Sequence, residues 1–184
     1  FDRSSKPSPV FKLTIPISLS TLAPIIQHRN SVSIMTNTNS GVPSEPHSKY
    51  AKGKLERLLR AGAFVVTAET TPPISSDPTA LLEATADLRD WADAVNVTDG
   101  AGAKSHMSSL AAASLLVQAN VEPVLQFTIR DRNRIALQND LLGAGALGIS
   151  NILCLTGDNV SAGDQPDAKM VMDMDIRGLM ALAR

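Results

Sequence analysis

Three acidic residues of this sequence stand where apolar runs end. Glu69, Asp99 and Asp158 each follow a stretch of mostly aliphatic residues. If these stretches are parallel strands, their carboxyl ends meet at one edge of a sheet, where ligands and catalytic groups gather. Carboxyl groups there can move a proton or hydrogen-bond a ligand. This edge is therefore the candidate site.

Glu69 is the best placed of the three to act as a general acid. It follows Ala68, and the pair Pro72 and Pro73 comes soon after it. Two prolines cannot continue a strand ladder, so the strand must end there. A carboxyl group partly desolvated at such a place holds its proton to higher pH than an exposed one. The residues alone leave two roles open, a proton donor and a carboxylate that caps a loop.

Alternating strands and helices are predicted to position these residues. Period and composition predict strands over 63–68, 94–98, 124–128 and 151–155. Cap residues and helical spacing predict five helices. A lead-in helix ends at Gly62, and a second helix starts at Asp77. The others are expected over 105–119, over 132–142, and from near Asp173 or Asp175 onward. Asp131 is expected to cap the 132–142 helix, and Gly143 and Gly145 to end it.

The spacing of the strands predicts the fold class. Their ends recur about every 30 residues, near Glu69, Thr98, Thr128 and Thr156. Such alternation predicts an α/β fold with a parallel sheet and right-handed crossovers. A constant repeat favours a (β/α)8 TIM-type barrel over a doubly wound sheet, and about four of the eight units are present. We therefore expect residues 48–184 to be the amino-terminal half of a barrel, as a fragment of a longer enzyme.

The first 47 residues differ in composition from the rest. Residues 1–47 are rich in Ser, Pro, Thr and Asn, and their only acids are Asp2 and Glu45. This composition is typical of a disordered segment. Two other interpretations stay open: an organellar transit peptide, because the part before Met35 is acid-poor, or a non-native stretch with Met35 as the true start.

Composition excludes several classes of function. The 184 residues carry a net charge of −1, with 43% hydrophobic and 3% aromatic residues, which is typical of a globular domain that binds neither nucleic acid nor membrane. Cys154 lies within an apolar run, so we expect a small core residue and a reducing, cytoplasmic setting. His28, His47 and His106 are scattered, so no metal site is expected.

One glycine motif is misleading. Gly143, Gly145 and Gly148 spell G-x-G-x-x-G, but a helix is predicted before them and a strand after them. The dinucleotide-binding fingerprint requires the reverse order, a strand before and a helix after. We therefore expect a helix cap and a tight entry into the fourth strand.

Longer segments around the candidate residues resemble a known family. Glu69 before the proline pair is followed in order by ADAVNVTDG at 92–100, EPVLQFTIRDRNRIALQNDLLGA at 122–144 and NILCLTGD at 151–158. Over about residues 62–175 the chain resembles methylenetetrahydrofolate reductases, in particular the branch with RDRN after the third strand. The resemblance implies a TIM-type barrel with FAD, which reduces 5,10-methylenetetrahydrofolate to 5-methyltetrahydrofolate for one-carbon metabolism. NADH or NADPH is the implied electron donor.

The resemblance also implies roles for individual residues. Glu69 matches the glutamate that protonates the folate, and Asp158 matches an aspartate between flavin and folate. The matching cofactor contacts are Thr98, Asp99, Gly100, Ala101, Gln126, Thr128, Thr156, Gly157 and Asp158. Arg130 is a further candidate, for the flavin diphosphate or the glutamate tail of folate, although a solvated helix start accounts for it equally well.

Two classes of function remain open at this stage. The first is a flavin-dependent folate reductase, as a homo-oligomer or with a partner reductase subunit. The alternative is a non-catalytic, reductase-like binding or assembly module of a larger complex. The presence of both Glu69 and Asp158 favours the reductase, and an unrelated barrel enzyme would need chemistry that ignores Glu69.

Overall fold

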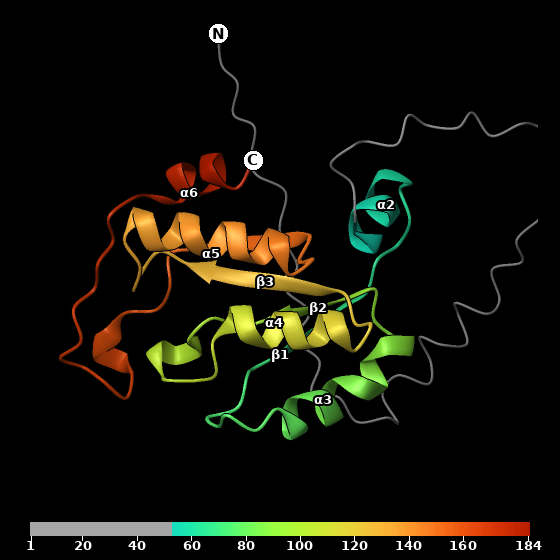
Figure 1. The fold of residues 1–184 in the computed structure, drawn as a ribbon, viewed down its shortest axis with the longest axis horizontal. Coiled ribbons are helices and arrows are strands. Elements are labelled where there is room, and N and C mark those ends of the chain that lie inside the picture. The colour runs from blue at the N-terminus through green and yellow to red at the C-terminus, as the bar shows by residue number, and fades with distance from the viewer. Residues whose placement is uncertain (1–52) are drawn as a thin grey trace, which may run out of the picture. The chain divides into compact units, whose positions relative to one another are not determined.

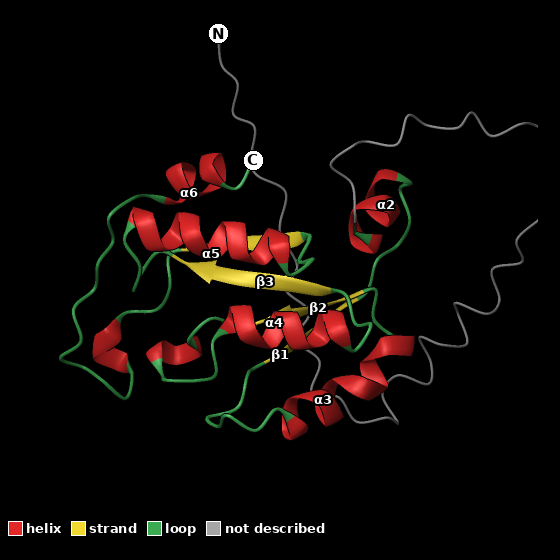
Figure 2. Ribbon diagram, viewed as in Figure 1, coloured by secondary structure: helices red, strands yellow, loops and turns green. Residues whose placement is uncertain are grey.

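The computed structural model describes residues 53–184, which form one parallel sheet flanked by helices (Figures 1 and 2). The predicted N-terminal segment 1–47 and the start of the lead-in helix lie outside the described residues. The strands, in sheet order, are β1 (Thr67–Thr70), β2 (Ala94–Val97), β3 (Pro123–Thr128) and β4 (Asn151–Leu155). All three neighbouring pairs are parallel, which confirms the predicted α/β class.

Helices and short 3-10 turns alternate with these strands. The helices are α2 (Lys54–Arg60), α3 (Thr79–Ala86), α4 (Ser109–Gln118), α5 (Arg134–Ala146) and α6 (Ile176–Leu182). The 3-10 turns are η1 (Asp87–Asp90), η2 (Ala101–Ala103) and η3 (Val160–Ala162). Among residues 53–184, none of the helices has the length and apolar character needed to cross a bilayer.

One face of the sheet is buried under helices. Side chains alternate between the two faces along a strand, and those of Val95, Val97, Leu125 and Phe127 are almost fully buried in a single apolar cluster. The helices contribute to the same cluster Leu81, Leu116, Leu137 and Leu179. In Figure 1, β3 is visible between α5 and α4. Burial of this apolar surface is the main force that holds helices and sheet together.

The other face of the sheet carries polar and exposed side chains. The register places Glu69 beside Asn96, and Asn96 beside Val124. Gln126, two residues further along β3, points to the same face and pairs in register with Leu153. Glu69 is exposed, and Leu153 keeps 42% of its surface accessible. We call this side the open face.

The first strand begins later than predicted. Phe64 is 82% exposed, and regular pairing starts only where Thr67 meets Ala94. Before that point the chain is held by Asp93, which exchanges hydrogen bonds with the backbone of Val66. Glu69 therefore lies within β1 rather than just after a strand.

The start of α5 corrects a predicted cap. The helix begins at Arg134, and the Asn133 side chain, not Asp131, accepts the backbone N–H bonds of Ile135 and Ala136. Asp131 is instead engaged by the guanidinium of its neighbour Arg130. The cap therefore moves two residues along the chain.

The end of α5 also differs from the prediction. Gly143 and Gly145 lie inside the helix, which continues to Ala146, and it is Gly148, with φ +80°, that turns the chain towards β4. Helix formation is cooperative, because each added residue forms a further backbone hydrogen bond. Two glycines weaken the helix but need not end it. The G-x-G-x-x-G pattern thus falls in a helix and its exit.

The other helix starts lie close to their predicted places. Asp175 caps α6 by accepting the N–H of Gly178 at 2.8 Å, as predicted. Asp77 bonds to both the N–H and the hydroxyl of Thr79, where α3 begins. The helix predicted over 105–119 is shorter, because η2 and an extended segment precede α4.

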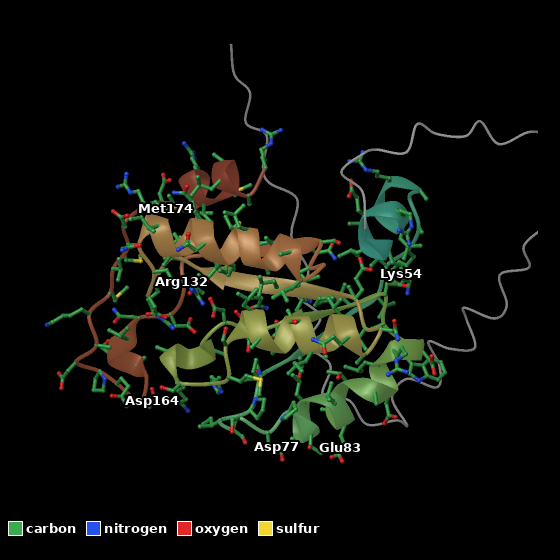
Figure 3. The ribbon with its side chains drawn as sticks, in the orientation of Figure 1. Lys54, Asp77, Glu83, Arg132, Asp164 and Met174 are labelled. Carbon is green, nitrogen blue, oxygen red and sulfur yellow. The ribbon has the colours of Figure 1, made fainter. Side chains whose placement is uncertain are left out.

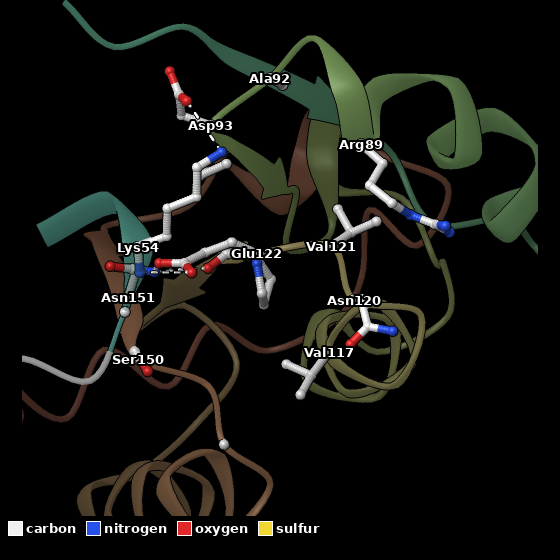
Figure 4. A pocket seen from close by; sticks show the side chains of 14 residues that line it. Lys54, Arg89, Ala92, Asp93, Val117, Asn120, Val121, Glu122, Ser150 and Asn151 are labelled. Carbon is white, nitrogen blue, oxygen red and sulfur yellow. Dashed lines mark hydrogen bonds and ion pairs between the residues drawn. The ribbon is translucent and has the colours of Figure 1, made fainter. Parts of the chain in front are cut away.

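A carboxylate joins elements at the amino-terminal end of the sheet. Glu122, just before β3, accepts backbone N–H bonds from Lys54 (2.8 Å) and Leu55 (2.9 Å), and a side-chain bond from Asn151 (3.0 Å) (Figure 4). Lys54 also pairs with Asp93 at 3.1 Å. Lys54, Asp93, Glu122 and Asn151 are among the residues that line a pocket of about 290 Å³. Since α2 buries none of its residues fully, these polar contacts are its main anchor.

We predict that Glu122→Ala lowers the free energy of unfolding by about 2 kcal/mol, because hydrogen bonds to a charged acceptor are lost and the α2 donors lose their partner. Chemical denaturation measures the change. The matched control is Glu83→Ala, at an exposed position of α3, which we expect to stay within about 0.5 kcal/mol of the wild type. Equal effects of the two substitutions would contradict the anchoring role of Glu122.

Candidate active site

A largely buried ion pair joins the ends of β2 and β3. The side chain of Asp99 is 10% exposed and that of Arg132 17%, and Arg132 Nη1 lies 2.7 Å from Asp99 Oδ2. Thr128 donates to the same oxygen from its backbone N–H (2.9 Å) and its hydroxyl (3.0 Å). Arg132 Nη2 and the Ser109 hydroxyl donate to Oδ1. Both carboxylate oxygens of Asp99 are thus engaged within the chain, and the contact of Asp99 with a cofactor stays a prediction.

The surroundings of this pair favour the ionised state of both groups. Burial alone would raise the pKa of Asp99, but the hydrogen bonds and charge of Arg132, with the two bonds from Thr128, hold that pKa below its usual value. Arg132 lies over the Phe127 ring at 4.9 Å and also pairs with Asp140 at 3.0 Å. Figure 3 shows Arg132 near the carboxyl end of β3, opposite the end marked by Lys54.

Arg130 ties together the loops that follow β2 and β4. Its side chain is 6% exposed, and Nη1 donates to the carbonyl oxygens of Gly100 and Asp158, each at 3.3 Å. Nε and Nη2 donate to Asp131 at 2.8 and 2.7 Å. Most of the N–H donors of the Arg130 guanidinium are therefore hydrogen-bonded within the chain. The contact of Arg130 with a ligand stays a prediction.

The third arginine of this stretch also has an internal partner. Arg134 pairs with Asp173 through Nε at 2.9 Å, and its backbone N–H donates to the same carboxylate. These bonds lower the pKa of Asp173 to about 2. These bonds hold the segment before α6, which contains Asp173, against the start of α5 at Arg134.

Two aspartates hold the loop after β4 against the loop after β2. Asp158 Oδ2 accepts the backbone N–H of Gly102 at 2.8 Å, and Asp164 Oδ2 accepts that of Ser105 at 3.0 Å. The bond from Ser105 lowers the pKa of Asp164. Asp164 lies in the long segment beyond the carboxyl ends of the strands (Figure 3). Asp158 thus lies at the loop that was predicted to hold flavin, and it remains exposed.

Gly157 is required by a close approach of two chains. Its φ is +90°, and a Cβ added to it would lie 2.9 Å from the Cβ of Arg130 and 3.2 Å from that of Thr128. Any side chain here would be strained and would press against β3. Position 157, between β4 and Asp158, therefore requires glycine.

Glu69 has a hydrogen-bond partner two strands away. Gln126 Nε2 donates to Glu69 Oε2 at 2.9 Å. Gln126 is 9% exposed, whereas Glu69 is exposed on the open face. The predicted partial desolvation of Glu69 is therefore wrong for the described residues, because the groups that flank it in sequence, Ala68 and the prolines, do not cover its carboxylate.

The remaining predicted site residues lie at the carboxyl ends of β2, β3 and β4 or in the loops that follow them. Thr98 and Thr128 are buried, and their hydroxyls bond to Thr71 and Asp99. Thr156 is exposed, and Gly100 and Ala101 form the turn into η2. The ends of β2, β3 and β4 are thus brought together, and Glu69 lies beside them on the open face.

Sequence reasoning missed several residues that build this edge. Arg132 and Ser109 hold Asp99, and Asn133 starts α5. A signal for Arg132 was present, because an aspartate directly after a buried strand needs a cation or several donors. The RDRN stretch supplies cations close to the third strand end. Which arginine reaches Asp99 depends on the turn geometry, which the sequence does not display.

We predict that Asp99→Asn lowers the free energy of unfolding at pH 7 by about 3 kcal/mol, because it leaves a largely buried guanidinium without its main counter-charge. The value lies at the low end of the range for buried pairs because Arg132 keeps 17% of its side chain exposed and Asp140 still faces it. Urea denaturation measures the change. The control is Asp167→Asn at an exposed position, for which we expect no significant change.

The same variant has a defined pH dependence. The folded-state pKa of Asp99 lies below the unfolded value of about 3.9, so its stabilisation is fully present above about pH 5. It is lost as the pH falls through the folded-state pKa. The stability difference between wild type and Asp99→Asn should therefore be constant from pH 5 to 7 and shrink below about pH 4. A difference that grows on acidification would contradict this assignment.

Comparison with known proteins agrees with this arrangement. No curated protein matches the chain. The family model for methylenetetrahydrofolate reductase matches residues 54–180, which is more than half of the chain and includes every candidate site residue from Glu69 to Asp158. On this match, together with the parallel sheet and the strand-end residues described above, the chain belongs to the methylenetetrahydrofolate reductase family.

Proposed function

We propose that this chain reduces 5,10-methylenetetrahydrofolate to 5-methyltetrahydrofolate, with Glu69 as the proton donor. The observation that carries the proposal is the position of Glu69 on the open face, where its carboxyl group is accessible and held by Gln126. Membership of the reductase family supplies the reaction class. The RDRN stretch at 130–133 supports placing the chain in the branch that carries this motif.

The chemistry requires one proton and one hydride. In the substrate a methylene carbon bridges two nitrogens of the folate. Glu69 donates its proton to one of these nitrogens, and the bond between that nitrogen and the methylene carbon breaks. The electron pair of the broken bond stays on the protonated nitrogen, and the other nitrogen forms an iminium with the methylene carbon. A hydride then completes the methyl group, so that the substrate gains two electrons and, in total, two hydrogens. Proton donation by a positioned carboxyl group is general acid catalysis.

The fold proposed for this reaction is a TIM-type barrel. The helices α3 to α6 each contribute apolar residues to the single cluster on one face of the sheet, and the strand order follows the chain. A doubly wound sheet carries helices on both faces, whereas a barrel carries them only on the outside. The open face then corresponds to the barrel interior. The described residues supply four βα units, and a closed barrel requires eight.

The residues present fit a flavin at the carboxyl ends of the strands. Leu153 offers exposed aliphatic surface on the open face, and the exposed Thr156 and Asp158 offer polar atoms at its edge. At Gly102, φ +65°, an added Cβ would meet nothing within 4 Å, so there is open space beside this residue, although its N–H is bonded to Asp158. We propose FAD as the cofactor, which supplies the hydride when bound and reduced by NADH or NADPH. Thr156, Gly157 and the backbone of Gly100 to Gly102 would hold it, and Asp158 would orient the folate.

We predict that Glu69→Gln lowers kcat for methylenetetrahydrofolate reduction by about 10²- to 10⁴-fold, the usual contribution of a positioned general acid. Glutamine keeps the shape, but its amide is too weak an acid to protonate the folate. The measurement is steady-state turnover of the full-length protein, with its flavin content determined by absorbance. Flavin content should stay at the wild-type level, because Glu69 is proposed to act on the folate.

The matched control is Glu83→Gln on the exposed surface of α3, which should leave turnover unchanged. Full turnover by Glu69→Gln would overturn the proposed role and favour an unrelated reaction. A wild-type protein that binds no flavin and shows no turnover would favour a non-catalytic binding or assembly module instead.

A further inference from the structure

Gln126 reaches Glu69 across an intervening strand. β1 and β3 are both neighbours of β2, so their backbones lie about 9–10 Å apart at the usual strand spacing. Two long side chains can bridge this distance, and the 2.9 Å bond between Gln126 Nε2 and Glu69 Oε2 shows that they do. A residue shorter by one methylene group at either position would leave a gap.

The intervening strand leaves this path clear. Asn96, on β2, is the register partner of Glu69 and points to the same face. Its side-chain amide donates to the carbonyl oxygen of Ala68 at 3.0 Å, so it is bonded to the backbone of β1 instead of the Glu69 carboxylate. Held in this way, the short Asn96 side chain does not obstruct the hydrogen bond between Gln126 and Glu69.

The bridge joins an exposed group to a buried one. Glu69 has three rotatable side-chain bonds and lies exposed, so alone it would sample several rotamers. Gln126 is 9% exposed and lies on the central strand β3, every residue of which is buried. The rigid partner therefore fixes the mobile one, which is the arrangement needed for a proton donor that must meet a substrate atom in one geometry.

We propose that Gln126 is the positioning residue of the proton donor Glu69. This inference rests on the proposed function and adds to it a residue that acts through Glu69. Gln126 suits both states of the reaction, because its N–H donates to the carboxylate and its carbonyl can accept from the protonated acid after rotation of the amide. A carboxylate or an aliphatic residue at position 126 lacks one or both of these capacities.

The charged groups at the neighbouring strand ends are compensated. Asp99 at the end of β2 pairs with Arg132, and Arg130 after β3 pairs with Asp131. Asp158 after β4 bonds to the Gly102 amide. Asn96 and Gln126, the residues of β2 and β3 beside Glu69 on the open face, are both neutral. Gln126 is therefore a neutral hydrogen-bond partner for Glu69.

The test compares Gln126→Asn and Gln126→Glu with the wild type in the full-length protein. Gln126→Asn keeps the amide but is too short to reach. We expect kcat to fall roughly 10- to 100-fold, as for a misplaced catalytic group. KM should stay within about twofold and flavin content should stay unchanged.

Gln126→Glu keeps the length and places a second carboxyl group against Glu69. It should also lower kcat, because a carboxylate has no N–H to donate to Glu69. Gln138→Asn, the same chemical change as Gln126→Asn on the exposed side of α5, is the matched control and should leave kcat and KM as in the wild type. A wild-type kcat in both Gln126 variants would overturn the proposal.

Two further measurements separate this inference from the proposed function. In the Glu69→Gln background, Gln126→Asn should cause no additional loss of kcat, because a residue that acts through Glu69 has nothing left to position. A full additional loss would mean that Gln126 acts elsewhere, for example on the cofactor. The NMR signals of the Gln126 side-chain amide need no turnover, because this amide donates to Glu69. A change in these signals on Glu69→Ala supports the bridge even if the reductase assay fails, and unchanged signals reject it.

Discussion

The site depends first on the buried pair of Asp99 and Arg132. An ion pair taken out of water is stabilising only if its remaining donors and acceptors are also satisfied. Here Thr128, Ser109 and Asp140 complete the set, so that β2, β3, α4 and α5 meet at one point. The aromatic face of Phe127 covers the guanidinium. This network fixes the edge at which the proposed chemistry takes place.

Polar contacts and apolar burial have separate places in the molecule. The apolar cluster lies between the helices and one face of the sheet, and its aliphatic residues determine that the helices gather on that side. The loops at the carboxyl ends are held by charged and glycine residues, among them Arg130, Asp158 and Gly157. The open face is left for side chains that can meet a ligand, Glu69 first among them. This separation lets the site be polar and accessible without weakening the core.

The strands and their order were predictable from sequence because they depend on local pattern. Runs of β-branched and aliphatic residues recur at a near-constant spacing, and such alternation has few solutions besides a parallel sheet. The caps were less predictable, since Asp131 and Asn133 are equally good capping residues and the choice depends on which of them Arg130 engages. The exposure of Glu69 was not predictable, because burial depends on what covers a face. Its contact with Gln126 joins residues 57 positions apart and follows from sheet register.

The central claim is that the open face, with Glu69 and Gln126 upon it, reduces a methylene bridge on folate. The most direct measurement is a single turnover without oxygen, in which the flavin of the full-length protein is first reduced and 5,10-methylenetetrahydrofolate is then added. The account predicts rapid reoxidation of the flavin, seen in visible absorbance, with one equivalent of 5-methyltetrahydrofolate formed, and strongly slowed reoxidation in Glu69→Gln. Reoxidation at the wild-type rate in Glu69→Gln, or a reduced flavin that persists in the presence of the folate, would contradict it.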